Sequence, residues 1–196
     1  LQNLILLGDH STTRITDLPK DTIDFFKKLA GYDTLRLVLA KAIILVEGPS
    51  DELIVQRAYL DAKGKLPIDD DIDVISVGLS HKRFLELAVR LKRRAWVVTD
   101  NDGKSVEEVT QRFATYLGNK FVSLHVGSDP RLNTLEPQIV DANDLSTLNA
   151  VLEWKCSSKE EVLKSMLEDK TSAALAIFES KTKIVIPKYI QDVIGE

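Results

Sequence analysis

The sequence predicts an α/β fold: a mostly parallel sheet with helices on both faces and an added helical subdomain. Apolar runs rich in β-branched residues alternate with amphipathic helical segments through the first two thirds of the chain. Two of these runs end in acidic turns. From Asp141 the composition shifts to helical segments. Alternating strand and helix patterns are typical of parallel sheets, and the later helices indicate an addition to that core.

Composition narrows the class of protein. Hydrophobic content is 44% and charged content 29%, which suits a globular protein with a full core. The net charge of −4 excludes a generic polyanion binder, so contact with nucleic acid would need local basic patches or bound cations. Cys156 is the one cysteine, which excludes an internal disulfide and favours a reducing, cytoplasmic compartment. No apolar run reaches the ~18 residues of a membrane span. Because the chain begins at Leu1 rather than Met, we expect a fragment of a longer protein.

The first 40 residues read as a lead-in. Residues 1–20 predict a strand followed by polar turn residues from Gly8 to Thr13. Residues 21–39 predict helices, with Asp21 as a cap and Gly31 as a stop. No site is expected here.

The next unit begins with a buried strand. Residues 42–46 form a continuous β-rich run, as in a parallel strand covered on both faces. Glu47-Gly48-Pro49 breaks the run. Ser50 is then a suitable N-cap, with Asp51 in the first helical turn.

The remaining elements follow the same logic. Further strands are expected at 72–77, 95–99 and 120–126, and the helices between them are expected to start near Ser80 and to span 105–117. A loop over 127–137 follows. The rest of the chain predicts helices over 143–155, 158–169 and 171–179, a short strand at 184–186 and a helix from Pro187. The expected division is a lead-in over 1–40, a core over 41–140, a helical subdomain over 141–180 and a return to the core over 181–196.

Acidic residues follow two of the strands. Glu47 ends one strand, and Asp100 and Asp102 end another. Sites in parallel sheets form beyond the carboxyl ends of the strands, so neighbouring strands would bring these carboxylates together. Close carboxylates require a cation, protonation or intervening water, and Mg²⁺ suits a few carboxylates and several waters. Asp51 is expected beside the same carboxyl ends of the strands, so the pattern indicates a shared metal site. Taken singly, each acid is also consistent with an ordinary turn or helix-start residue.

The two acidic turns together resemble a Toprim domain, the fold shared by topoisomerases, bacterial primases and some nucleases. More specifically, most of the chain is similar to the C-terminal region of OLD-family (overcoming lysogenization defect) nucleases. That family is related to the nuclease subunit of the Gabija anti-phage system. The segments that carry the resemblance are ILVEGPSDELI at 44–54, KRFLELA at 82–88, VVTDNDG at 97–103, TLEP at 134–137, and the later DKTSAALAIFES and IPKYIQDVI.

The resemblance implies a Toprim-type Rossmann-like sheet and phage-defence-type DNA cleavage. Two Mg²⁺ or Mn²⁺ ions are expected, with Ca²⁺ as a non-catalytic substitute. The residues that resemble the family's metal-binding acids are Glu47, Asp51, Asp100, Asp102 and, as an additional acid, Glu136.

Lys170 resembles the lysine that neutralises phosphate charge in the transition state, although Lys181 and Lys183 lie nearby and compete for this role. The family further implies DNA as substrate, an ATPase domain before this region, no membrane, and oligomer contacts outside the fragment.

Two alternatives stay open. A topoisomerase- or primase-like chemistry would use the same acids, and a topoisomerase also needs a nucleophilic tyrosine; Tyr32, Tyr59, Tyr116 and Tyr189 sit in predicted helices or at their ends without a supporting signature. A non-catalytic regulatory α/β domain would bind one Mg²⁺ and give Lys170 no role.

Overall fold

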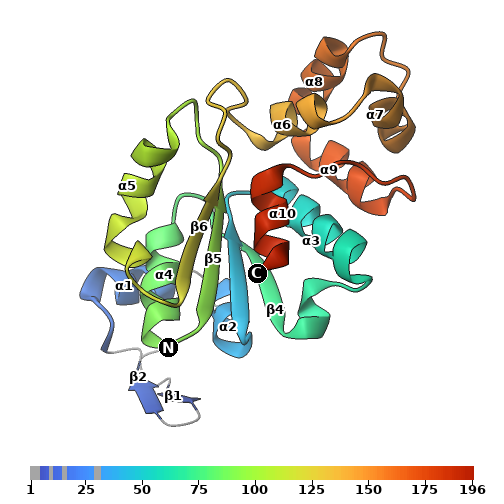
Figure 1. Cartoon of the computed structure of the whole chain (residues 1–196). Helices are drawn as coiled ribbons and strands as arrows, with labels where there is room; N and C mark the ends of the chain where they lie inside the picture. Colours follow the sequence, from blue (N-terminus) through green and yellow to red (C-terminus); the bar gives the residue numbers. More distant parts are fainter. Residues whose placement is uncertain (1–4, 9–10, 15–16, 29–31) are drawn as a thin grey trace.

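A four-stranded parallel sheet forms the centre of the molecule (Figure 1). The computed structural model describes residues 5–8, 11–14, 17–28 and 32–196. The sheet has the order β4-β3-β5-β6, and its strands are β3 (Ala42–Val46), β4 (Ile72–Ser76), β5 (Arg94–Thr99) and β6 (Val122–Val126). The α/β class expected from the sequence is confirmed.

Strands β3 and β5 are direct neighbours. Their parallel register pairs Ala42 with Arg94 and Leu45 with Val97. The two strands therefore end at the same edge, and the acidic turns that follow them emerge side by side.

Helices cover both faces because successive residues of a strand point to opposite sides. Ile44 and Val46 of β3 pack into one core cluster, and Ile43 and Leu45 pack into the other. The first cluster lies under α3 (Pro49–Lys63), α10 (Lys188–Gly195) and the helical subdomain, and the second under α1 (Lys20–Lys28), α2 (Tyr32–Leu39), α4 (His81–Arg90) and α5 (Val106–Leu117).

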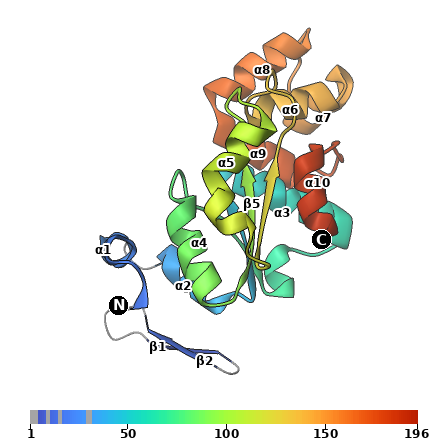
Figure 2. The same ribbon diagram turned by 60° about the vertical axis from the view of Figure 1, so that its left-hand side comes forward.

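The helical subdomain lies beyond the carboxyl edge of the sheet (Figures 1 and 2). It comprises α6 (Leu135–Ala142), α7 (Leu145–Leu152), α8 (Lys159–Glu168) and α9 (Lys170–Glu179). Helix α9 packs along α3, and the buried Arg57 of α3 donates to the carbonyl oxygens of Ser180 (2.7 Å) and Thr182 (2.9 Å). These bonds fix the chain after α9 and so the direction of that helix.

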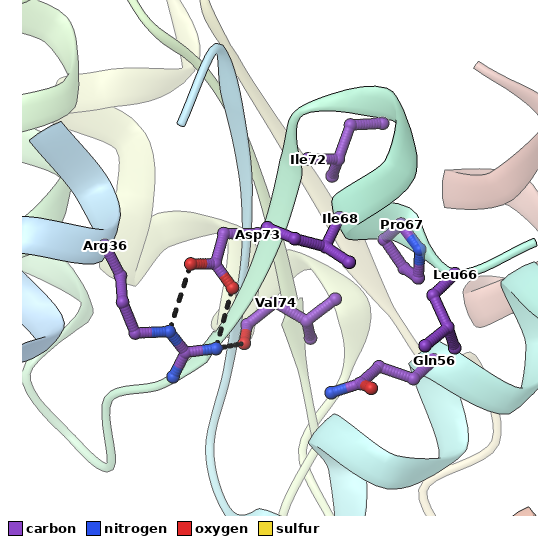
Figure 3. A pocket seen from close by; sticks show the side chains of 8 residues that line it. All are labelled: Arg36, Gln56, Leu66, Pro67, Ile68, Ile72, Asp73 and Val74. Atoms are coloured by element: carbon purple, nitrogen blue, oxygen red, sulfur yellow. Dashed lines mark hydrogen bonds and ion pairs between the residues drawn. The ribbon is translucent and has the colours of Figure 1, made fainter. Parts of the chain in front are cut away.

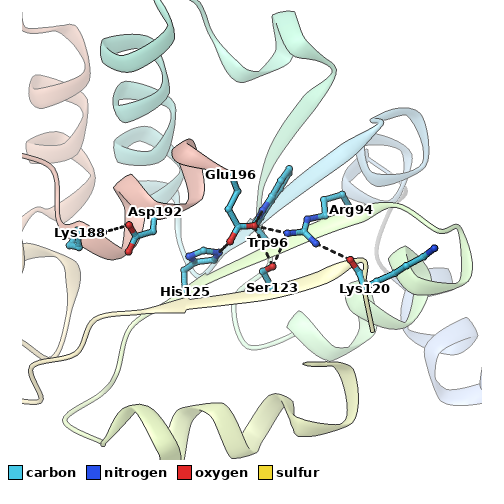
Figure 4. Close-up of polar contacts among 8 residues, drawn as sticks. All are labelled: Arg94, Trp96, Lys120, Ser123, His125, Lys188, Asp192 and Glu196. Atoms are coloured by element: carbon cyan, nitrogen blue, oxygen red, sulfur yellow. Dashed lines mark hydrogen bonds and ion pairs between the residues drawn. The ribbon is translucent and has the colours of Figure 1, made fainter. Parts of the chain in front are cut away.

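Helix α10 returns to the sheet and runs antiparallel to the strands. Glu196, just after the helix, accepts hydrogen bonds from Trp96 Nε1 (2.8 Å) and Arg94 Nη2 (2.5 Å), near the amino end of β5 (Figure 4). The first turn of α10 therefore lies at the opposite, carboxyl edge of the sheet.

Helix α2 is joined to the edge strand β4 by Arg36. Its guanidinium donates to Asp73 Oδ2 (3.0 Å) and Oδ1 (2.7 Å), and to the carbonyl oxygen of Val74 (2.6 Å) (Figure 3). The pocket beside this contact lies on β4, away from the acidic turns.

Several local expectations were wrong. Ser11–Thr13 belong to strand β2 (Ser11–Arg14), which pairs antiparallel with β1 (Ile5–Gly8), rather than to a turn; Asp9 and His10 lie outside the described residues. The expected strand at 184–186 does not form, because Val185 N–H donates to Asn143 Oδ1 (2.7 Å) and its carbonyl accepts from Asn143 Nδ2 (2.9 Å).

Two helix starts also differ from expectation. Helix α3 is capped by Gly48 rather than Ser50, since the Gly48 N–H donates to Asp51 Oδ2 (2.9 Å). Helix α6 shortens the expected loop and places Glu136 in a first helical turn. No helix among the described residues is long and apolar enough to cross a membrane.

Candidate metal centre

Glu47 joins the two acidic turns. Its Oε1 accepts hydrogen bonds from the backbone N–H of Asp100 (3.2 Å) and from the hydroxyl of Thr99. The side chain after β3 is thus bound to the start of the turn after β5. The convergence expected from the strand ends is present.

Asp51 lies in the first turn of α3, facing the same edge. Burial, as the largest cause, and the charges of Glu47 and Glu136 raise the pKa of its carboxyl to about 6, although the hydrogen bond from the Gly48 N–H opposes them. A carboxyl with this pKa is partly protonated near neutral pH unless a cation compensates its charge.

Asp100 is the most perturbed acid of the centre. Burial, as the largest cause, and the charges of Asp51, Glu47 and Glu136 together raise the pKa of its carboxyl to about 8, against the opposing charge of Lys170. Its Oδ1 is buried and has no hydrogen-bond partner among the described residues. A buried oxygen of this kind calls for a donor or a cation. The donor set, all carboxylate oxygen, fits a hard divalent cation.

Glu136 and Lys170 meet at this centre from the helical subdomain. Glu136 is 4% exposed, and its Oε2 accepts from the Thr134 hydroxyl (2.9 Å) and from Lys170 Nζ (2.9 Å). Lys170 is the first residue of α9. Lys183 instead lines a groove beside the C-terminal half of α3, so Lys170 is the lysine that the fold brings to the acids.

Asp102 lies at the rim. Its side chain is 49% exposed and approaches Arg112 Nη1 at 3.5 Å, and its backbone φ of 53° is in the left-handed region. The main charges that act on Asp51 are those of Glu47 and Glu136, and Asp100 experiences these two together with Asp51 and Lys170; Asp102 is not among them. In this conformation, no three His, Cys, Asp or Glu side chains of the described residues are arranged to hold a metal ion. Side-chain rotation is therefore needed to close a ligand set, and Lys170 already occupies one oxygen of Glu136.

Asn101 is a site residue that the sequence marked only as part of a turn. It is fully buried, and its Nδ2 donates to the carbonyl oxygens of Gly127 (3.1 Å) and Asp129 (2.9 Å). Its Oδ1 accepts from the Gly103 N–H (2.8 Å). These bonds fix the acidic turn against the loop after β6. An asparagine between two aspartates was the available signal, but its burial was not evident from the sequence.

Tyr189 is a second residue whose place was not foreseen. It lies in the first turn of α10, is 6% exposed, and its hydroxyl has no hydrogen-bond partner among the described residues. Burial raises its pKa well above the usual value, and the charges of Asp100, Asp51, Glu47 and Glu136 raise it further. The phenol therefore shares the acids' surroundings.

Comparison with known proteins agrees with this geometry. Residues 38–102 match the family model "Overcoming lysogenization defect protein-like, TOPRIM domain", a span that includes both acidic turns. Glu136 and Lys170 lie outside that span, so their place at the centre rests on the fold. A search of curated proteins found no match.

Two solved structures share the fold over most of the chain. The C-terminal region of the Burkholderia pseudomallei OLD protein superposes with a TM-score of 0.60 at 22% identity, covering 80% of this chain and 96% of that one. The C-terminal region of the Xanthomonas campestris pv. campestris OLD protein gives a TM-score of 0.53 at 20% identity, covering 80% and 93%. The chain thus has the α/β fold of the C-terminal region of OLD proteins, and its residues 38–102 match the model of the OLD-like Toprim domain.

Proposed function

We propose that this chain is a metal-dependent DNA endonuclease module, the catalytic C-terminal part of a larger ATPase–nuclease. The observation that carries the proposal is the Asp100 carboxylate, whose Oδ1 is buried without a hydrogen-bond partner among the described residues and which is surrounded by other acids. Such a group keeps its negative charge at neutral pH only with compensating positive charge. An OLD-like Toprim domain with this feature fits a nuclease better than a structural module.

The ligands would be the acids of the two turns and of α6. Mg²⁺ or Mn²⁺, two ions in all, would be held by Glu47, Asp51, Asp100, Asp102 and Glu136, with Ca²⁺ as a non-catalytic substitute. When bound, such ions lower the pKa of an attacking water and stabilise the leaving oxygen of a phosphodiester.

Lys170 supplies the remaining positive charge. In the structure its ammonium group is held by Glu136 at 2.9 Å and its side chain is 43% exposed, so Lys170 is both oriented and accessible. Once Glu136 serves as a ligand, the same ammonium can contact a non-bridging phosphate oxygen in the transition state.

The rest of the assembly is proposed from the family. DNA is the expected substrate, without sequence selectivity. We also propose an ATPase domain before this region, a cytoplasmic location, and oligomer contacts outside residues 1–196.

A plasmid-nicking assay with Mg²⁺ and Mn²⁺ tests the proposal. We expect nicking by wild type, none with EDTA, and loss in Glu47→Ala and Asp102→Ala. The matched control is Asp71→Ala, which removes an exposed acid just before β4, at the other edge of the sheet. Unchanged nicking in either test variant contradicts the assignment, as does loss in the control.

The same assay addresses the topoisomerase-like alternative. Burial and the charges of the acids raise the pKa of the Tyr189 phenol, so this tyrosine is near the centre. Its side chain is buried, however, and cannot reach a DNA backbone. Quenching the reaction with denaturant should therefore leave no protein joined to DNA. A covalent adduct would favour the topoisomerase-like chemistry over hydrolysis.

A further inference from the structure

The position of Tyr189 follows from the direction of α10. The end of that helix is held against β5 and β6, where Glu196 contacts Arg94 and Trp96 in the amino half of β5 and His125 further along β6 (Figure 4). Its first turn is therefore at the carboxyl edge, where Glu47 and Asp100 lie. Helix α10, which is fixed at its C-terminal end, thus brings Tyr189 close to Glu47 and Asp100, although these residues are far apart in the sequence.

The ring and the hydroxyl of Tyr189 have different surroundings. The ring belongs to the core cluster that includes Val46 and Val98, the last buried residues of β3 and β5 on that face. The hydroxyl is enclosed as well, but no described residue accepts or donates a hydrogen bond to it. Buried phenols usually have a partner, because an unpaired buried hydroxyl is costly.

Asp100 has an unpaired hydrogen-bond acceptor, which complements the unpaired donor of Tyr189. Its Oδ1 is also buried and unpartnered, and Asp100 is the charge that acts most strongly on the Tyr189 phenol. A neutral phenol can donate one hydrogen bond, and a carboxylate oxygen can accept one. Two unsatisfied groups of opposite hydrogen-bonding type thus lie at the same edge of the sheet, and the charge of one acts on the other.

We propose that Tyr189 is a positioning residue of the metal centre, whose phenol donates a hydrogen bond to the Asp100 carboxylate, directly or through one bound water, and so orients it toward the cation. This inference rests on the proposed metal centre and extends it. Partners of this kind that hold a metal ligand in place typically change metal affinity about 10- to 100-fold when they are removed. Tyr189 touches neither substrate nor metal, so its role is one of orientation.

Tyr189→Phe separates this role from simple packing, because it deletes the hydroxyl and keeps the ring. Calorimetric titration with Mn²⁺ should show a dissociation constant raised about 10-fold or more. The matched control is Tyr59→Phe. Tyr59 is also 6% exposed, but its hydroxyl donates to Asp70 Oδ2 (2.5 Å), which lies just before the amino end of β4. This control should bind Mn²⁺ like wild type.

Each outcome has a defined meaning. A Tyr189→Phe protein that binds Mn²⁺ within twofold of wild type overturns the positioning role. Loss of its fold, followed by circular dichroism in EDTA, also overturns it, since the hydroxyl would then be structural. If wild type binds no Mn²⁺, the metal centre itself is wrong. If wild type binds Mn²⁺ in a Tyr189-dependent way but does not nick DNA, only the nuclease proposal fails.

Discussion

Neutralising Asp100 should make the metal-free protein more stable at alkaline pH. Asp100→Asn removes a charge that the fold holds among other carboxylates and leaves a side chain of nearly the same size. The folded-state pKa of this carboxyl is about 8, against an ordinary value of 3.8. Its folded pKa is therefore raised, and between these two values the folded protein binds more protons than the unfolded chain.

The sign and the size of the effect follow from that difference. The free energy of unfolding should fall as pH rises from about 4 to about 8, because the unfolded chain releases this proton earlier. At about 1.4 kcal/mol per pH unit, the shift sets an upper bound of roughly 6 kcal/mol. The repulsion is shared among several acids and is reduced by solvent, so we expect Asp100→Asn to gain about 2 kcal/mol at pH 8.5. Near pH 4 the two proteins should be equally stable.

Urea unfolding in EDTA, followed at several pH values between 4 and 9, measures this difference directly. Addition of Mn²⁺ should then reverse the order of stability. Wild type gains about 2.7 kcal/mol when the ion is at 100 times its dissociation constant, and the variant, which lacks a ligand, gains less. The distinctive result is that the variant is the more stable protein without metal and wild type is the more stable protein with metal.

Asp129→Asn is the matched control, since it makes the same chemical change on an acid whose pKa is lowered to about 2 by Arg131. That depressed pKa contributes stability above about pH 4, so this variant should gain nothing at pH 8.5. A metal-free wild type whose stability is flat between pH 5 and 8.5, or an Asp100→Asn variant no more stable there, would refute the proposed repulsion.

Three further variants address other parts of the structure. Lys170→Ala should lower the nicking rate about 100-fold or more while leaving the Mn²⁺ dissociation constant within a few-fold, because this ammonium acts on phosphate; single-turnover nicking beside calorimetry checks it. Asn101→Ala should cost about 2–3 kcal/mol in urea unfolding, since it leaves the buried carbonyl of Gly127 without its donor. Arg57→Ala should cost about 3 kcal/mol and expose the chain after α9 to trypsin at Lys181, because the guanidinium holds that segment.

The sequence was sufficient for the sheet because its signals there are local. Residues 42–46 read as a doubly covered strand, and β3 is buried from Ile43 to Val46. Acids after two such strands were predicted to lie close together if the strands were neighbours. The pairing of β3 with β5 confirms that they are neighbours. The register of these two strands is enough to bring the Glu47 side chain to the backbone N–H of Asp100.

Features set by distant contacts were not readable in the same way. The irregular course of residues 184–186 depends on Asn143, whose side chain replaces a strand partner for Val185. The choice of Lys170 over Lys183 depends on where α9 begins relative to α6. No local pattern carries that relation, and only the family resemblance placed Lys170 among the site residues.

The centre has a consistent construction that explains its electrostatics. Asp51, Glu136, Lys170 and Tyr189 each lie in the first turn of a different helix, α3, α6, α9 and α10. Unpaired N–H groups give helix starts a partial positive charge, which favours nearby acids. That contribution is too small here, because the pKa values of Asp51 and Asp100 remain raised despite it. The fold therefore concentrates acids beyond what its own dipoles and Lys170 compensate. Protons relieve the remaining repulsion below the raised pKa values of Asp51 and Asp100, and divalent cations are expected to relieve it when they bind and displace those protons, which links the stability of this edge of the sheet to occupation of the proposed site.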